Sequence, residues 1–413
     1  PSAIDMGLDR AREVTNRMGL QKPAPRVVTV TGTNGKGSTC AFVASLRRAQ
    51  GRKVGVYNSP HLLRYNVRVQ VDRAEVSDEQ LCEAFSALEA GRGQTSLTYF
   101  EMGTLAAFWL FERAQLDAVV LEVGLGGRLD AVNLVDADLA LVTSIGVDHV
   151  EYLGNTRESV AYEKAGIFRP GKPALCGDLN PPQPLLDKAA ELGCPLFVRG
   201  RDFDLATADS VWHWQGRDAA GQVVELRDLP MENAALALQA YALTGLPWQP
   251  ERIIEALQGT QVTGRLDRRQ FNWHGKTLNM LLDVGHNPHA AEYLVKRLQQ
   301  RPIAGRRLAV FGLLADKDLD GVVSQLAPVV AHWAVAPLNT GRTRPAAELQ
   351  GSLQDLGARV SVFASVEAAL EAQCEQATGQ DEILLFGSFY CVAEALEWLQ
   401  RRATEEAANG FAG

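Results

Sequence analysis

Short apolar runs rich in β-branched residues alternate with longer stretches whose apolar positions recur at helical spacing. The runs that predict buried strands are residues 27–30, 54–57, 118–123, 139–145 and 174–176. The stretches 38–49 and 99–113 between them predict helices. Continuous apolar strands separated by helices indicate a parallel sheet that is covered on both faces.

The alternation stops between residues 181 and 229, where Pro, Gly, Trp and charged residues mix. We interpret this region as peripheral strands and loops. Helical spacing returns at 232–244 and 250–257, and a second alternation follows. Its expected strands are residues 278–284, 308–313, 333–336, 359–363 and 383–386. The tail, residues 403–413, is expected to be frayed.

These patterns predict an α/β protein of two domains, because 413 residues exceed what one ordinary core holds. Residues 1–262 are expected to form a nucleotide-binding domain with a mostly parallel sheet. Residues 271–413 are expected to form a smaller Rossmann-like α/β domain. The polar, glycine-bearing stretch 259–269 has no clear period, and we place a linker and hinge at 263–270.

Composition narrows the classes of function. The formal net charge of −8 argues against a nucleic-acid partner, since a phosphate backbone demands a concentrated basic face. Six scattered cysteines without a C-x-x-C pair indicate reduced thiols and a cytoplasmic protein. No apolar run approaches the about 20 residues that span a bilayer, and no signal peptide is visible. The start at Pro1 rather than Met leaves open a preceding segment.

The sharpest motif is a strand–turn–helix segment at residues 27–39, which reads VVTVTGTNGKGST. Its glycines let the backbone point N–H groups at an anion, and Lys36 adds a cation for the β- and γ-phosphates of a nucleotide. The expected nucleotide contacts are Thr33, Asn34, Gly35, Lys36, Gly37 and Ser38. Gly32 lies only three residues before Gly35, which departs from the common phosphate-loop spacing. The alternative is an ordinary tight turn after a strand.

Polar residues stand just beyond three of the expected strands. Ser59, Glu122 and His149 follow the runs at 54–57, 118–121 and 139–145. Open α/β sheets bind ligands at the carboxyl ends of their strands, and magnesium prefers oxygen ligands. The three residues therefore predict a metal site beside the phosphate loop. Glu122 as a solvated or ion-paired carboxylate, and His149 as an interior histidine, are the alternatives.

Residues 31–39 resemble the loop of the Mur ligase and folylpolyglutamate synthase superfamily. Within it, the chain resembles the bacterial bifunctional dihydrofolate synthase/folylpolyglutamate synthase family. The other segments that carry the resemblance, in family order, are residues 57–62, 97–101, 121–130, 148–149, 163–167, 283–288 and 387–389. Val67 stands where the family commonly has an acid, which puts a charge contact near residues 64–68 in doubt.

The resemblance implies a two-domain Mur-ligase-like fold that uses ATP and two Mg²⁺ ions, and it leaves room for a monovalent cation. It implies Ser59 and Glu122 on one Mg²⁺, and His149 with Glu122 near the second. It implies a CO₂ adduct, N6-carboxylysine, at Lys164; a neutral or charged lysine that touches phosphate directly is the alternative. The catalytic set is then Lys36, Glu122, His149 and Lys164.

Further roles follow from the resemblance alone. Asn233, Arg265 and Asp283 correspond to nucleotide contacts, although Arg265 could instead be a surface arginine on a linker. His286 and Ser388 would help to seat the incoming glutamate. The residues implied to hold the pterin substrate are Thr98, Tyr99, Phe100, Glu101, Leu129, Asp130 and Ala131. Tyr99 and Phe100 offer flat faces for an aromatic ring, but Phe100 could equally be a core residue.

The resemblance implies an ATP-dependent ligase that activates a pterin carboxylate as an acyl phosphate and joins it to L-glutamate. Nothing in the sequence suggests more than a monomer. The expected pterin substrates are 7,8-dihydropteroate and tetrahydrofolate, and no membrane partner is expected. Closure of the two domains about 263–270 would exclude water. The alternatives are a cell-wall ligase that adds an amino acid to a UDP-muramyl substrate, and a non-catalytic ATP-binding switch.

Overall fold

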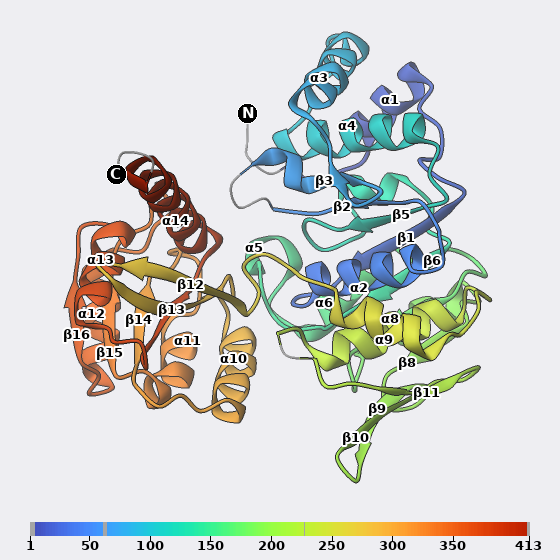
Figure 1. The fold of residues 1–413 in the computed structure, drawn as a ribbon. Helices are drawn as coiled ribbons and strands as arrows, with labels where there is room; N and C mark the ends of the chain where they lie inside the picture. The colour runs from blue at the N-terminus through green and yellow to red at the C-terminus, as the bar shows by residue number, and fades with distance from the viewer. Residues whose placement is uncertain (1–4, 61–63, 227, 411–413) are drawn as a thin grey trace. The chain divides into compact units, whose positions relative to one another are not determined.

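The computed structural model describes residues 5–60, 64–226 and 228–410. The chain divides into two compact units, Pro1–Val262 and Thr263–Gly413. In Figure 1 the first unit runs from blue to yellow and the second from gold to red. Within the described residues, no helix combines the length and apolarity that crossing a bilayer takes.

The first unit is built on an eight-stranded sheet with the order β4-β3-β2-β5-β1-β6-β7-β8. All neighbouring strands pair in parallel except β3 with β2 and β4 with β3. The strands are β1 (Arg26–Thr31), β2 (Val54–Tyr57), β3 (Val69–Val71), β4 (Ala74–Glu75), β5 (Ala118–Glu122), β6 (Leu139–Val142), β7 (Ala174–Cys176) and β8 (Leu196–Val198). The mostly parallel sheet expected from the apolar runs is thus confirmed.

Helices cover both faces of this sheet. Successive residues of a strand face opposite sides of the sheet, so neighbouring residues pack against different helices. Val27 and Val119 belong to one core cluster, whereas their neighbours Val28 and Val120 belong to another. The helices on the first face are α1 (Asp9–Met18), α3 (Asp78–Arg92), α4 (Tyr99–Ala114), α6 (Arg157–Ala165) and α7 (Gln183–Glu191). Those on the second are α2 (Lys36–Arg48), α8 (Met231–Ala242) and α9 (Pro250–Gln258).

Strand β1 occupies the point where the strand order reverses, because β5 lies on one side of it and β6 on the other. The crevice at such a switch point is where open α/β sheets bind ligands. The segments that follow β1, β5 and β6 therefore share one edge of the sheet. The short helix α5 (Val150–Leu153) follows the last of these segments.

The region 181–229 is only partly what the sequence predicts. Strands β9 (Asp204–Ala208), β10 (Val211–Gln215) and β11 (Ala220–Val223) do form a peripheral three-stranded sheet, visible at the lower end of the first unit in Figure 1. The prediction misses helix α7, whose first turn contains Pro184. Proline is tolerated in a first helical turn, so this cluster of prolines marks a helix start rather than a loop.

The second unit has a six-stranded sheet with the order β12-β13-β17-β14-β15-β16, parallel except for the edge pair β12–β13. Its strands are β12 (Asp267–Trp273), β13 (Lys276–Asp283), β14 (Arg307–Phe311), β15 (His332–Val335), β16 (Val360–Val362) and β17 (Glu382–Phe386). Its helices are α10 (Pro288–Gln300), α11 (Leu319–Leu326), α12 (Ala346–Asp355), α13 (Val366–Gln376) and α14 (Phe389–Gly410). The α/β class with a second, smaller unit is confirmed.

Two boundaries differ from the expectation. Residues 267–270 of the expected linker belong to β12, an antiparallel edge strand whose exposed polar residues hide it from a search for apolar runs. The tail is helical to Gly410, as part of α14, instead of frayed from residue 403; residues 411–413 lie outside the described part. Hinge motion about 263–270 remains a prediction.

Candidate active site

The phosphate loop lies between β1 and α2, and two glycines shape it. Gly32 has a φ of 154° and Gly35 a φ of 87°. A Cβ atom at Gly35 would lie 2.7 Å from the side-chain nitrogen of Asn233, so only glycine fits there. Helix α2 begins at Lys36, two residues earlier than expected, directly after this glycine. A glycine turn that opens a helix presents backbone N–H groups to an anion.

Side chains inside the loop are held by the protein itself. The ammonium of Lys36 donates to the carbonyl oxygen of Gly32 at 2.9 Å. The side-chain amide of Asn233, on α8, donates to the hydroxyl of Ser38 at 2.8 Å, and both residues are buried. The structure thus brings Asn233 to the loop across 195 positions of sequence.

The carboxylate of Glu122 lies at the end of β5, where the side chain is buried. The backbone N–H of Ser59, which follows β2, donates to it at 3.3 Å. His149 starts helix α5 with a left-handed backbone (φ 50°) and is half-buried. Within the described residues, no group of three or more His, Cys, Asp or Glu side chains is placed to hold a metal ion. The metal set of Ser59, Glu122 and His149 remains a prediction.

Lys164 lies near the end of α6, with its side chain almost fully buried. Burial lowers the pKa of Lys164 well below its ordinary value; the charge of Lys36 adds to this and that of Asp148 opposes it. Two of the expected catalytic residues, Lys36 and Lys164, are therefore close enough to influence each other. The lowered pKa favours the neutral amine of Lys164, which is the form that attacks CO₂.

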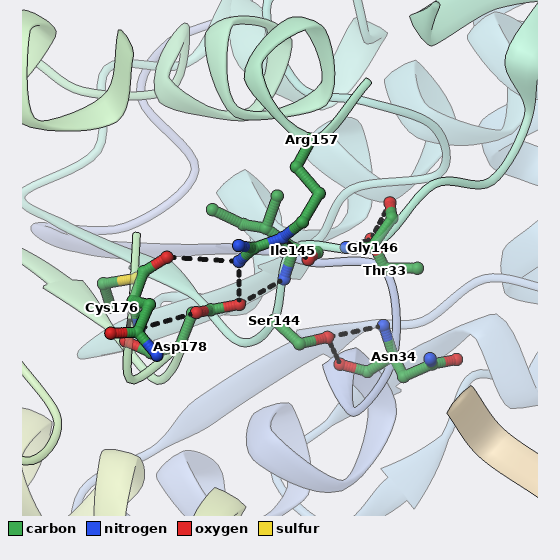
Figure 2. A network of polar contacts seen from close by, with 9 residues as sticks. Thr33, Asn34, Ser144, Ile145, Gly146, Arg157, Cys176 and Asp178 are labelled. Atoms are coloured by element: carbon green, nitrogen blue, oxygen red, sulfur yellow. Dashed lines mark hydrogen bonds and ion pairs between the residues drawn. The ribbon is translucent and has the colours of Figure 1, made fainter. Parts of the chain in front are cut away.

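The segment between β6 and α5 is bonded to the phosphate loop (Figure 2). Thr33 donates its hydroxyl to the carbonyl of Gly146 at 2.9 Å and accepts the N–H of Gly146 at 2.9 Å. The N–H of Asn34 donates to the hydroxyl of Ser144 at 3.0 Å. Thr33 and Asn34, expected to touch nucleotide, thus also fix the segment that leads to His149.

Helix α4 begins with the segment expected to hold the pterin. Thr98 and Glu101 form a capping box, with Thr98 N–H to Glu101 carboxylate at 2.8 Å. Arg10 donates to the same buried carboxylate at 2.8 and 3.1 Å. Tyr99 is 63% exposed, whereas Phe100 is half-buried against Gly124. Tyr99 is thus the more exposed of the two rings, and Glu101 has a structural role. Substrate roles for residues 98–101 remain predictions.

The turn after Glu122 is shaped by Asp130. Its carboxylate accepts the backbone N–H groups of Gly124, Leu125 and Val132 at 3.0, 2.9 and 3.0 Å. Burial raises the pKa of Asp130 to about 6, although these three donors oppose the rise. Its neighbours Leu129 and Ala131 are half-buried and buried. A structural role for Asp130 is evident, and a substrate role for these three residues remains a prediction.

Val67, which stands where the resembled family commonly has an acid, lies in the 3₁₀ helix Tyr65–Arg68 and is half-buried. Next to it, the guanidinium of Arg68 lies 5.1 Å from the ring centre of Tyr65 and 5.7 Å from that of Tyr99. Residues 61 and 62 of the segment 57–62 lie outside the described residues.

The second unit gathers its own expected site residues at adjacent strand ends. Asp283 of β13 pairs in register with Phe386 of β17, so His286 and Ser388 follow neighbouring parallel strands. The buried carboxylate of Asp283 accepts the N–H groups of Leu266 and Gly285 at 3.1 and 2.8 Å.

Aromatic and charged contacts complete this group. The guanidinium of Arg265 lies 5.9 Å from the ring centre of Phe389, and the ring of His286 lies 6.3 Å from the same ring. Burial raises the pKa of Asp283, and the charge of Arg265 opposes the rise. Ser388 is buried and accepts the N–H of Tyr390 at 3.1 Å. Arg265, Asp283, His286 and Ser388 are thus gathered at one edge of this sheet.

Comparison with known proteins covers both units. A family model described as "Mur ligase middle domain" matches residues 30–192, and one described as "Mur ligase, glutamate ligase domain" matches residues 264–389. The chain is 45% identical over 399 residues to the dihydrofolate synthase/folylpolyglutamate synthase of Escherichia coli strain K12, across 97% of this chain and 92% of that protein.

Solved structures agree with this similarity. Escherichia coli FolC in complex with DHPP and ADP gives a TM-score of 0.90 at 44% identity, covering 97% of this chain and 95% of that one. A bifunctional folylpolyglutamate synthase/dihydrofolate synthase with Mn, AMPPNP and L-glutamate bound gives a TM-score of 0.88 at 44% identity, covering 96% of this chain and 95% of that one.

Proposed function

The chain belongs to the dihydrofolate synthase/folylpolyglutamate synthases of the Mur ligase family, and from this premise we infer that it joins L-glutamate to a pterin-bearing carboxylate with hydrolysis of ATP. The observation that carries the proposal is the phosphate loop of β1–α2, with Lys36 and the Asn233–Ser38 pair inside it. It lies at the strand-order switch of the sheet, beside the buried carboxylate of Glu122.

The residues of the loop fit a nucleotide triphosphate with a divalent cation. Gly35 leaves no room for a side chain, and the N-terminus of α2 follows it. The hydroxyl of Ser38 and the carboxylate of Glu122 are hard oxygen donors of the kind that Mg²⁺ prefers. One Mg²⁺ held by Ser59 and Glu122, and a second near His149 and Glu122, would supply positive charge to the phosphate oxygens; both cations and these ligands are part of the proposal.

For the first step we propose that Lys36 leaves its bond to Gly32 and stabilises charge on the transferring phosphoryl group. Phosphoryl transfer depends mainly on positioning and electrostatics, so one fixed cation contributes much. A carboxylate oxygen of the substrate attacks the γ-phosphorus, the bond to the β-phosphate oxygen breaks, and ADP leaves. The product of this step is an acyl phosphate.

For Lys164 we propose carboxylation. Its neutral amine nitrogen forms a bond to the carbon of CO₂ and loses one proton, so a buried amine becomes a buried carboxylate. The new anion would compensate the positive charge of Lys36. That charge disfavours the protonated form of an unmodified Lys164. Thr98 and Tyr99 at the start of α4, together with residues 129–131, are proposed to hold the pterin substrate.

In the second step we propose that the second unit delivers glutamate, with His286 and Ser388 as its binding residues. The amine attacks the acyl carbon, a proton leaves the nitrogen, and phosphate departs with the oxygen it gained. Asp283 and Arg265 are also proposed as nucleotide contacts. The proposed form is a monomer, and the proposed compartment is the cytoplasm.

A substrate panel tests this function. The purified chain receives ATP, Mg²⁺ and glutamate with 7,8-dihydropteroate, tetrahydrofolate or a UDP-muramyl peptide in turn, and ADP release and the amide product are measured. We expect turnover with a pterin substrate that requires glutamate. Turnover with the UDP-muramyl substrate alone would favour a cell-wall ligase, and ADP release that ignores glutamate would favour a nucleotide switch.

A matched pair of lysine variants makes the panel sharper. Lys36→Met is expected to abolish turnover, because it removes the cation inside the loop. Lys53→Met changes an exposed lysine of the same unit and is expected to leave turnover unchanged. Equal activity of the two variants would contradict the role of the loop.

A further inference from the structure

Residues 144–149, between β6 and α5, have no regular secondary structure, although they lead to His149 at the proposed metal site. Their position must therefore be set by contacts from other elements. On one side these contacts come from the phosphate loop: Ser144 bonds to Asn34, and Gly146 bonds to Thr33 in both directions.

On the other side, residues 144–149 are held by an ion pair whose two residues belong to none of the motifs found in the sequence. Arg157, the first residue of α6, donates to the carboxylate of Asp178, which follows β7, at 2.9 Å. Both residues also bond to the backbone of Ile145. The Nε of Arg157 donates to the carbonyl of Ile145 at 2.9 Å, and the N–H of Ile145 donates to the carboxylate of Asp178 at 3.2 Å. Figure 2 shows Ile145 beside this pair, with Asp178 bonded to both Arg157 and Ile145.

We propose that Arg157 and Asp178 are positioning residues of the ATP site, which set the distance between the phosphate loop, His149 and helix α6. Both backbone polar groups of Ile145 are taken by this pair, so the segment cannot shift without breaking it. Because α6 also carries Lys164 near its other end, the same arginine fixes the helix on which that lysine lies. The inference rests on the proposed function.

The geometry of the arginine is essential to this role. Its guanidinium reaches three acceptors at once: the carbonyl of Ile145, the carboxylate of Asp178 and the carbonyl of Asn180 at 3.2 Å. A lysine ammonium has no planar fork and cannot match that pattern. The Arg157 side chain is 41% exposed, so an ion pair of this kind adds little to global stability. An effect on catalysis larger than on stability is therefore the signature of positioning.

The test compares Arg157→Lys and Asp178→Asn with the wild-type chain. The readouts are the Kd for AMPPNP with Mn²⁺ by titration calorimetry, kcat, the KM values for ATP and glutamate, and the thermal midpoint. Arg199→Lys and Asp204→Asn are the matched controls, since that pair is a 3.1 Å ion pair of the same unit between half-buried residues. The controls are expected to behave like wild type.

For both variants we expect the Kd for AMPPNP to rise and kcat to fall by about 10- to 100-fold, as when groups that orient metal ligands are removed. The KM for glutamate should stay within about twofold and the thermal midpoint near that of wild type. The inference is overturned if both variants bind AMPPNP as tightly as wild type, or if they lose no more than the controls. It is also overturned if the thermal midpoint drops and all binding and kinetic constants worsen together, with the KM for glutamate rising as much as the Kd for AMPPNP. A wild-type chain that forms no amide would refute the proposed function instead.

Discussion

Replacing Lys164 by methionine separates the chemistry of this residue from its packing. The side chain is almost fully buried, and methionine has nearly the same length and shape without the amine. Volume-conserving exchanges in a core cost less than about 1.5 kcal/mol. In addition, methionine removes an amine whose charged form is disfavoured by burial and by Lys36. We therefore expect the unfolding free energy of Lys164→Met at neutral pH to equal or exceed that of the wild type, within about 1.5 kcal/mol.

The pH dependence of stability has a definite sign. The folded-state pKa of Lys164 lies well below its unfolded value, so between the two the unfolded chain binds more protons. Wild-type stability in CO₂-free buffer should therefore rise with pH across that window, which ends near the unfolded pKa of about 10.4. Lys164→Met has no group to titrate there and should lack this rise. Denaturation curves at several pH values measure the difference.

Activity should respond in the opposite direction to stability. If the carboxylated lysine organises the phosphate and metal site, its loss should lower kcat by about 10- to 100-fold. This corresponds to roughly 1.4 to 2.7 kcal/mol in the activation barrier. Wild-type activity should fall when CO₂ is removed and return with bicarbonate, whereas Lys164→Met should ignore bicarbonate. In Lys164→Ala, added acetate should restore part of the activity.

Two results would refute this reasoning. Normal kcat in a folded Lys164→Met chain would show that neither the amine nor its adduct takes part. A loss of activity accompanied by a drop of several kcal/mol in unfolding free energy would show that the lysine is structural.

Two further predictions concern the elements around the site. In Arg10→Met, the buried carboxylate of Glu101 loses both contacts with the Arg10 guanidinium, so the unfolding free energy should fall by about 1–3 kcal/mol and the KM for dihydropteroate should rise with the KM for ATP unchanged. Arg17→Met, which breaks an exposed pair, is the control; equal effects of the two would contradict the prediction. Asp130 has a pKa raised to about 6, so the folded state binds the extra proton, and stability should fall by about 2 kcal/mol as pH rises from 4 to 6. Asp130→Asn should lack that contribution in unfolding curves, and an identical pH slope in the two proteins would contradict it.

The sequence predicts those parts of the fold whose residues are buried on both sides. Residues 27–30 and 118–122 read as strands because helices cover both faces of the sheet. Strand β12 shows no such run, since it is an antiparallel edge strand in which only Trp273 is buried. The last turns of α14 read EEAANG and have no apolar stripe to reveal them.

The site divides in a similar way. The phosphate loop is visible in the sequence because its glycines and lysine are contiguous. The contact of Asn233 with Ser38 joins positions far apart, and only the resemblance pointed to Asn233. Nothing marks Arg157 or Asp178, because an arginine at a helix start and an aspartate after a strand are common, and their shared target is the backbone of Ile145.

Transfer of oxygen from substrate to phosphate tests the central claim most directly. Dihydropteroate with an ¹⁸O-labelled carboxylate is incubated with the chain, ATP, Mg²⁺ and glutamate, and the released phosphate is analysed by mass spectrometry. One labelled oxygen should appear in phosphate for each amide bond formed, because the carboxylate oxygen attacks the γ-phosphorus and leaves with it. Unlabelled phosphate alongside amide product, or no amide product at all, would contradict the account.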